Sequence, residues 1–296
     1  MKRILLGSDW WTDCDDAVAV RLLANAVNRG EAELLGIGIN AAMPHSVASL
    51  RGFLDYSGLC DVPLGLDREA TDFGGAPSYQ ARLAKTLCPQ GSNDEAEDAV
   101  RLYRRILADA TSPLEMVEIG YLQVAVGLLQ SEGDDVSPKS GMELVKEKVT
   151  HFWVMAGKWD KDGERENNFC RNERARVAAE AFCRLCPVPV TFLGWEVGNT
   201  VLSGMGLPEE DPLCHVLRDH GSPNGRSSWD PMLVLLALEG DAEKAGYRTV
   251  RGTARVDPLD GSNYFTPHED GTHRYCVKTK PTAYYEERLA ALLAAK

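Results

Sequence analysis

Residues 3–20 of the chain read R-I-L-L-G-S-D-W-W-T-D-C-D-D-A-V-A-V, and this stretch decides the fold. A short apolar run precedes Asp9, four carboxylates lie between residues 9 and 16, and an apolar segment starts at Ala17. Four close like charges repel one another unless a cation or ligand hydroxyls balance them. Asp15 and Asp16 fall where a helix would begin, facing its amide groups. The pattern predicts a strand-loop-helix unit that holds a hard cation through oxygen ligands. A solvated acidic helix start is the simpler alternative.

The composition excludes several classes of partner. The 296 residues include 32 Lys and Arg against 44 Asp and Glu, so the formal net charge is −12. This balance argues against nucleic acid, which requires a basic face, and fits a small neutral substrate or a cation. No apolar run approaches the length of a membrane span, and residues 1–6 are too short for the apolar region of a signal peptide. Eight cysteines without a disulfide-type spacing indicate reduced thiols, so we expect a cytoplasmic protein.

Short apolar segments alternate with helix-like segments along much of the chain. The expected strands are Ile4–Ser8, Glu33–Asn40, Leu114–Ile119, His151–Met155 and Val188–Gly194. The expected helices are Asp16–Asn28, His45–Ser57, Asp94–Ala110, Gln123–Gln130 and Glu173–Cys186. Such alternation predicts an α/β fold with a mostly parallel central sheet covered by helices on both faces.

The second half of the sequence is less regular. We expect short helices at residues 211–218 and 232–238, the latter after an Asp-Pro pair that suits a helix start. Thr249–Val256 and Arg274–Lys278 alternate like strands and predict a small added C-terminal hairpin. Tyr284–Ala295 reads as an amphipathic terminal helix. Since there is no repeat or linker, residues 1–296 are expected to form a single domain.

Polar residues follow several of the expected strands. Ligands of parallel α/β sheets bind beyond the carboxyl ends of the strands, so side chains at these positions converge on one site. The residues concerned are Asp9, Asn40, Gly157, Lys158, Trp195 and Glu196.

Cysteine and histidine give no comparable signal. Cys183 and Cys186 form one C-x-x-C at the end of an expected helix, with no second pair to complete a metal site. We therefore interpret these two cysteines as partly buried residues at the end of a helix. The six histidines show no zinc-binding spacing.

Taken together, six short motifs resemble the inosine-uridine-preferring nucleoside hydrolase family. The first, S-D-W-W-T-D-C-D-D-A, is similar to a longer variant, T-D-x-G-N-D-C-D-D-A, of some bacterial members. The other five stand in the family's order at residues 36–40, 118–123, 154–157, 166–169 and 228–231.

The resemblance implies roles for individual residues. Asp9, Asp16 and Asp230 would bind a Ca²⁺ ion, with the backbone carbonyl of Gln123 as a further ligand. The ribose hydroxyls would be held by Asp15, Asn40, Glu166 and Asn168, with Met155 beneath the sugar. Asp13 has no counterpart in the shorter motif. It either contacts the metal-binding residues without binding the ion itself or is a solvent-facing carboxylate of the loop.

The implied reaction is hydrolysis of the N-glycosidic bond between ribose and a base. The transition state is oxocarbenium-like, so nearby carboxylates stabilise its positive charge. Asp9 would take the proton of a water that the metal positions. The resemblance also suggests a homo-oligomer, a dimer or tetramer, acting on a small nucleoside without nucleic acid or membrane.

The chain departs from the family pattern at three positions. The first Asp of the family's D-T-D is Gly7, the turn glycine is Trp11, and the histidine before the metal-binding Asp is Trp229. Trp229 cannot donate a proton at neutral pH, so stacking of the base on indoles is the suggested substitute, which favours purines. Trp195 lies at a strand end and is a second candidate, and Glu196 would bind a base edge or act as an acid.

Five tryptophans lie near strand ends or the first motif, namely Trp10, Trp11, Trp159, Trp195 and Trp229. At least two of them are expected only to pack in the core. Three functions therefore stay open: a Ca²⁺-dependent ribonucleoside hydrolase, a hydrolase of a modified nucleoside or another N-riboside, and a catalytically weak nucleoside- or sugar-binding protein. Phosphoryl transfer on an aspartate and an EF-hand both lack their required spacing.

Overall fold

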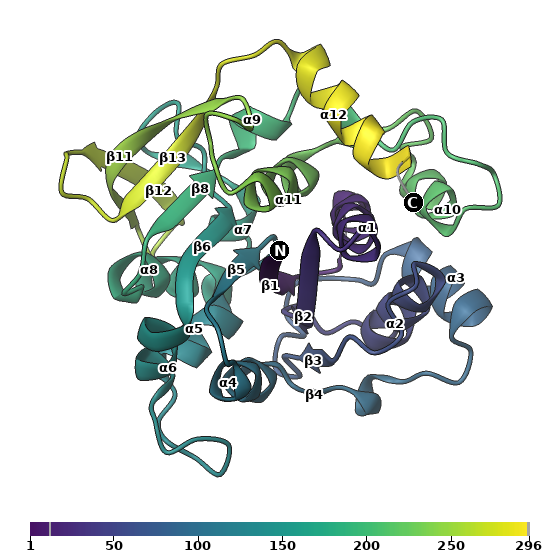
Figure 1. Ribbon diagram of the computed structural model, residues 1–296, viewed down its shortest axis with the longest axis horizontal. Helices are drawn as coiled ribbons and strands as arrows, with labels where there is room; N and C mark the ends of the chain where they lie inside the picture. Colours follow the sequence, from purple (N-terminus) through teal and green to yellow (C-terminus); the bar gives the residue numbers. More distant parts are fainter. Residues whose placement is uncertain (12, 295–296) are drawn as a thin grey trace.

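A mixed sheet of eleven strands organises the computed structural model, which describes residues 1–11 and 13–294. The strand order is β4-β3-β2-β1-β5-β6-β8-β13-β11-β12-β7. All pairs from β4 to β13 are parallel, and β13-β11, β11-β12 and β12-β7 are antiparallel. The mostly parallel α/β fold expected from the sequence is confirmed (Figure 1).

The strands of this sheet are β1 (Lys2–Ser8), β2 (Ala32–Ile39), β3 (Leu64–Leu66), β4 (Glu97–Asp98), β5 (Leu114–Glu118), β6 (Val149–Met155), β7 (Glu164–Arg165), β8 (Val190–Leu193), β11 (Tyr247–Val256), β12 (Ser262–Pro267) and β13 (His273–Lys278). A separate two-stranded sheet pairs β9 (Leu202–Ser203) with β10 (Arg226–Ser227). The α-helices are α1 (Asp15–Asn28), α2 (Ser46–Tyr56), α3 (Ser78–Leu87), α4 (Ala99–Asp109), α5 (Gln123–Gln130), α6 (Gly141–Lys148), α7 (Asn167–Cys170), α8 (Glu173–Leu185), α9 (Trp195–Gly198), α10 (Pro212–His220), α11 (Trp229–Glu239) and α12 (Thr282–Ala294), with a 3-10 turn at Asn93–Glu95.

Strand β1 shows why the sheet has two covered faces. Ile4 and Leu6 pack into a core shared with α1, α2, α3, α10, α11 and α12, whereas Leu5 packs into a core shared with α4, α5, α6 and α8. Successive side chains of a strand point to opposite faces, so a run without polar residues requires burial on both sides. The two groups of helices lie on either side of the sheet in Figure 1.

Two sequence expectations need correction, and a third extends beyond the described residues. The expected helix at 94–110 begins only at Ala99, because the 3-10 turn and β4 precede it. The C-terminal hairpin is larger than expected: β12 lies between the two predicted strands in sequence, and β13 joins the main sheet beside β8. The end of the expected terminal helix, Ala295, lies outside the described residues.

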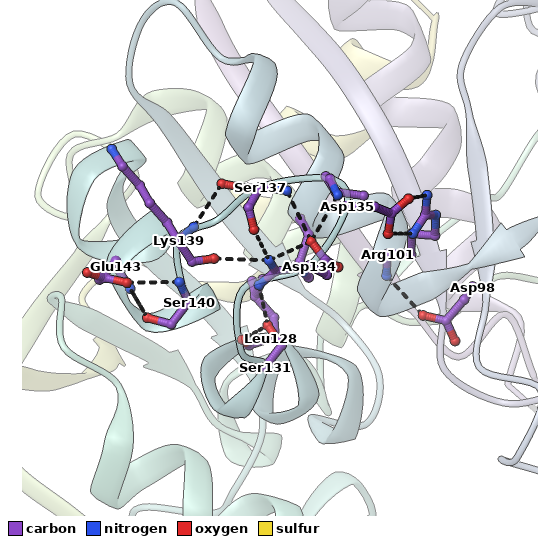
Figure 2. A network of polar contacts seen from close by, with 12 residues as sticks. Asp98, Arg101, Leu128, Ser131, Asp134, Asp135, Ser137, Lys139, Ser140 and Glu143 are labelled. Atoms are coloured by element: carbon purple, nitrogen blue, oxygen red, sulfur yellow. Dashed lines mark hydrogen bonds and ion pairs between the residues drawn. The ribbon is translucent and has the colours of Figure 1, made fainter.

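The loop between α5 and α6 is fixed by one buried arginine on α4. Arg104 donates to both carboxylate oxygens of Asp134, to Ser131 Oγ and to the carbonyls of Ser137 and Lys139. Figure 2 shows this network, together with the neighbouring pair of Arg101 and Asp135 at the surface. Since each acceptor belongs to the loop, the network holds an irregular segment against the helix layer.

Gly7 on β1 leaves room for a carboxyl group from β5. A β-carbon at residue 7 would lie 1.8 Å from Oε2 of Glu118 and 2.8 Å from the hydroxyl of Tyr103. Glu118 is fully buried, Tyr103 donates to its Oε1 at 3.4 Å, and burial raises its pKa to about 8. The space beside Gly7 on β1 is therefore filled by a carboxyl group from the adjacent strand β5.

This arrangement predicts a strong dependence of stability on residue 7. Gly7→Ala should lower the free energy of unfolding by about 1–3 kcal/mol, the usual cost of overpacking a core. Glu118→Ala introduced beside it should restore part of the loss, because it removes the atom that the new methyl group meets. Urea denaturation of both single variants and the double variant checks this, and purely additive losses would contradict it.

None of the helices in the described residues combines the length and apolar character required to cross a membrane.

Candidate active site

A cavity of about 260 Å³ lies where the first loop, the ends of β5 and β6, and the start of α11 meet. It is lined by Asp9, Trp11, Asp13, Asp15, Asp16, Ile119, Met155, Glu166, Asn167, Asn168, Trp195, Arg226, Trp229 and Asp230. A larger cavity of about 600 Å³ lies beside α1 and α12. Its buried charges, Arg21 and Asp211, form an ion pair with each other, so it offers no comparable chemistry.

Three aspartates from two helix starts meet at the first cavity. Carboxylate oxygens of Asp15, Asp16 and Asp230 lie within 4.8 Å of one another, and all three side chains are buried. The backbone N–H of Asp230 donates to Oδ2 of Asp15 at 3.1 Å, which joins the start of α11 to the start of α1. Burial and mutual repulsion raise the pKa of each aspartate well above its ordinary value. A divalent cation bound by these oxygens would balance their charge, so the donor set fits a hard metal ion.

Asp9 is held beside this cluster by a tight turn. Its Oδ1 accepts the backbone N–H of Trp11 at 3.0 Å, while Oδ1 of Asp16 accepts the hydroxyl of Ser8 at 2.5 Å. Burial raises the pKa of Asp9 to about 8, and the charge of Asp15 adds to this effect. A cation bound at the neighbouring carboxylates would favour the ionised form of Asp9, which is the form that can accept a proton from a reacting water.

Trp10 makes the turn possible at the cost of backbone strain. It has φ +45°, a left-handed conformation that is rare for a bulky residue, and its side chain is fully buried. Its indole N–H donates to Ser49 Oγ at 2.8 Å, and its carbonyl accepts from Gln80 at 2.5 Å. Residues in such conformations persist where the surroundings fix them and are concentrated at functional sites.

The opposite wall of the cavity carries the residues expected to bind a sugar. Glu166 accepts the backbone N–H groups of Gly157 and Asn168, both at 2.9 Å, and burial raises its pKa to about 7. The amide of Asn168 donates to the carbonyl of Met155 at 2.9 Å. These bonds fix the side chains that face the carboxylate cluster across the cavity.

Asn40 lies behind the cavity, next to Asp9. A β-carbon on Gly120 would meet the backbone nitrogen of Asp9 and Oδ1 of Asn40, so the three residues are in close contact. Oδ1 of Asn40 accepts the N–H of Tyr121 at 3.0 Å, and its Nδ2 is buried without a hydrogen-bond partner among the described residues. An unpaired buried donor is rare and suits a ligand oxygen.

Of the predicted site residues, Asn40, Gln123 and Glu196 do not belong to the lining of the cavity, although Asn40 lies directly behind it. Gln123 is the first residue of α5, where its carbonyl points along the helix, and its amide donates to the carbonyl of Asn40. From the same segment it is Ile119, directly after β5, that lines the cavity. The carboxyl group of Glu196 lies against Gly194, and its Oε2 accepts the backbone N–H of Trp159 at 3.2 Å.

The five tryptophans singled out from the sequence separate into two groups. Trp10 and Trp159 pack in the two cores, as expected for at least two of them, and the other three line the cavity. The rings of Trp195 and Trp229 stack with centroids 6.4 Å apart, and Nε1 of Trp229 donates to the carbonyl of Trp195 at 2.9 Å. A base sandwiched between two rings requires about 7 Å, twice a van der Waals contact. The pair therefore offers a base its outer surface rather than a slot.

Sequence reasoning missed Arg226 and left Asp13 undecided. Arg226 binds both carboxylate oxygens of Asp13, and both residues line the cavity. Burial alone would raise the pKa of Asp13, but hydrogen bonds and charge from Arg226 outweigh this and lower it. The two residues are 213 positions apart, so no local pattern could have revealed the pair.

Several solved structures superpose on this chain over almost its whole length. The purine-preferring ribonucleoside hydrolase of Gardnerella vaginalis superposes with a TM-score of 0.72 at 18% identity, covering 100% of both chains. The inosine-uridine preferring nucleoside hydrolase of Bacillus anthracis gives 0.70 at 15% identity, covering 99% of this chain and 100% of its own. The type III effector protein XopQ, in complex with adenosine diphosphate ribose, gives 0.68 at 19% identity over 99% and 94% of the two chains.

No protein-family model matches the sequence, and no curated protein sequence matches it. The likeness is therefore one of structure, and it extends over the whole of the compared chains. Together with the parallel sheet and the position of the cavity at its strand ends, it establishes that this chain has the nucleoside hydrolase fold.

Proposed function

We propose that the protein hydrolyses the N-glycosidic bond of ribonucleosides. The observation that carries the proposal is the cavity itself, which four buried aspartates line together with a glutamate and an asparagine held by hydrogen bonds. Negative charge on one wall stabilises an oxocarbenium-like sugar, and fixed polar groups on the other select its hydroxyls. Two proteins of the same fold are named as nucleoside hydrolases of purine or inosine-uridine preference, which supports this reaction class.

We propose Ca²⁺ as the metal of this site. Asp16 and Asp230 of the carboxylate cluster would hold the ion together with Asp9, and Asp15, the third member of the cluster, would add negative charge beside it. A backbone carbonyl would be a further ligand; Gln123 was expected to supply it, but of the two residues only Ile119 lines the cavity. Oxygen-only donors favour Ca²⁺ over softer metals. When bound, the ion would supply positive charge beside the attacking water and the ribose hydroxyls.

The remaining chemistry belongs to the side chains. The oxygen of the attacking water bonds to C1′ of the ribose, and Asp9 accepts the proton that this water loses. Asp15 accepts a ribose hydroxyl while it also accepts the N–H of Asp230. Glu166, Asn168 and the unpaired Nδ2 of Asn40 hold the other ribose oxygens and keep the sugar at attack distance. A deoxyribonucleoside leaves these groups unpaired and should react more slowly.

A panel of ribonucleosides, assayed for reducing sugar with and without a chelator, tests the reaction. We expect release of ribose that stops when the metal is removed. Cleavage only of a modified nucleoside or another N-riboside would keep the mechanism and change the substrate. Nucleoside binding with no ribose released from any substrate would instead support a catalytically weak binding protein.

We expect purine ribosides to be cleaved better than uridine. Trp229 and Trp195 offer stacking to a flat base, which is worth roughly 1–3 kcal/mol per base. Trp229→His should broaden the substrate range, and Trp229→Ala should raise the KM for inosine. Initial rates on inosine and uridine measure this. A wild-type preference for uridine over inosine of about tenfold or more would overturn the purine assignment.

The metal should also control the response of stability to pH. Because burial raises the pKa of Asp9 to about 8, the metal-free folded chain holds protons that the unfolded chain releases. Stability of the metal-free protein should therefore fall as the pH rises from about 5 to about 8. Since Ca²⁺ requires ionised carboxylates, the rise in Tm on adding it should be larger at the upper pH. Thermal melts with chelator or Ca²⁺ check both statements, and a Ca²⁺ effect that shrinks with rising pH would contradict them.

A further inference from the structure

Arg226 occupies an unusual place in the cavity. Among the described residues that line it, Arg226 is the only one with a basic side chain, and none is a histidine. It lies on β10, three residues before Trp229, and its guanidinium carbon is 5.1 Å from the centroid of the Trp229 ring. The one basic side chain among the described residues of the lining thus lies beside the indole of Trp229.

The guanidinium is oriented by one carboxylate. Nε donates to Oδ1 of Asp13 at 2.9 Å and Nη2 donates to Oδ2 at 2.6 Å, a bidentate pair. Such a pair fixes the plane of the group. Asp13 also accepts the N–H of Cys14 at 2.7 Å, so the carboxylate is itself held in place. The bidentate pair uses Nε and Nη2 and leaves the two N–H donors of Nη1 without a hydrogen-bond partner among the described residues.

We propose that Arg226 is the residue that assists departure of the base, by donating hydrogen bonds from Nη1 to the leaving base. The inference rests on the proposed hydrolysis. As the water oxygen bonds to C1′, the C1′–N bond breaks and its electron pair goes to the base, which becomes negatively charged. The water proton passes to Asp9, and the base takes a proton from solvent. The products are ribose and the free base.

Charge decides what Arg226 contributes to this step. A guanidinium stays protonated in proteins, so Arg226 stabilises the negative base without transferring a proton. The same cavity carries five aspartates and one glutamate, while the one arginine is already paired with Asp13. This balance disfavours a phosphorylated substrate and favours a neutral nucleoside whose base acquires charge only in the transition state.

A purely structural role for Arg226 makes a different prediction. The pair with Asp13 also ties the first loop to the segment before α11, and so holds the aspartates of both elements together. Loss of this ion pair would slow the hydrolysis of every substrate by the same factor. Loss of help to the leaving base would slow only substrates whose leaving group needs it.

The test compares inosine with 4-nitrophenyl β-D-ribofuranoside, whose leaving group is stable as an anion. Arg226→Met should lower kcat on inosine by about 10²- to 10³-fold, as for removal of one charge-stabilising donor, and should change kcat on the nitrophenyl riboside far less. Arg226→Lys should recover part of the rate on inosine. Asp13→Asn is the matched control, because it breaks the same ion pair but keeps the guanidinium.

The possible outcomes distinguish a failure of the role proposed for Arg226 from a failure of the proposed hydrolysis. Equal losses on both substrates in Arg226→Met and Asp13→Asn, with a lowered Tm, would show a structural tie and overturn the proposal. An unchanged rate on inosine in Arg226→Met would overturn it as well. If the wild-type protein cleaves neither substrate, the proposed hydrolysis itself fails, and the role of Arg226 fails with it.

Discussion

Asp9→Asn is expected to reduce kcat on the best nucleoside by about 10²- to 10⁴-fold, the usual contribution of a general base. An amide at this position still accepts the backbone N–H of Trp11, so the turn keeps its shape. It cannot accept the proton of the attacking water. KM should therefore change little while kcat falls, which steady-state kinetics with Ca²⁺ in excess will show.

A matched control is Asp67→Asn. Asp67 is an aspartate with a raised pKa outside the lining of the cavity, where its carboxylate accepts the amide of Gln123. This variant should retain most of the activity. If Asp9→Asn also turned over at a near wild-type rate, another group would have to be the base.

Asp230→Ala is expected to abolish both Ca²⁺ binding and activity. Asp230 is buried in the first turn of α11, within 4.8 Å of Asp15 and Asp16, and no other residue of α11 lines the cavity with a carboxylate. Calorimetric titration with Ca²⁺ should show no saturable binding. Removing a repelling charge should make the metal-free variant at least as stable as the metal-free wild type, so loss of activity cannot be attributed to unfolding.

Two results would contradict this assignment. One is retention of tight Ca²⁺ binding in Asp230→Ala with full activity. The other is a metal, zinc for example, found at Cys183 and Cys186 rather than at the aspartates. In the structure both thiols have a raised pKa caused by burial, which disfavours the thiolate form that zinc requires.

The first motif was predictable because its signal is local. Its apolar run, its aspartates and the start of α1 are adjacent in sequence, and the structure places all of them as expected. The short strands β3 and β4 at one end of the sheet and the helix α3 were not anticipated. Strands of two or three residues carry no period that distinguishes them from a loop.

The positions of Glu196 and Gln123 relative to the cavity were not predictable, for a common physical reason. Whether Glu196 faces the cavity depends on the turn at Gly194, and whether Gln123 offers a carbonyl depends on where α5 begins. Neither is encoded by residue type. Arg226 could be recognised only in three dimensions, since its partner Asp13 lies at the other end of the chain.

The contact between Gly7 and Glu118 has a consequence for the evolutionary history of the chain. A β-carbon at residue 7 would lie 1.8 Å from Oε2 of Glu118, so a larger residue at position 7 requires the glutamate to move or to become shorter. The two sites are therefore epistatic: a substitution that shortens residue 118 first should make a later side chain at residue 7 less costly than the reverse order.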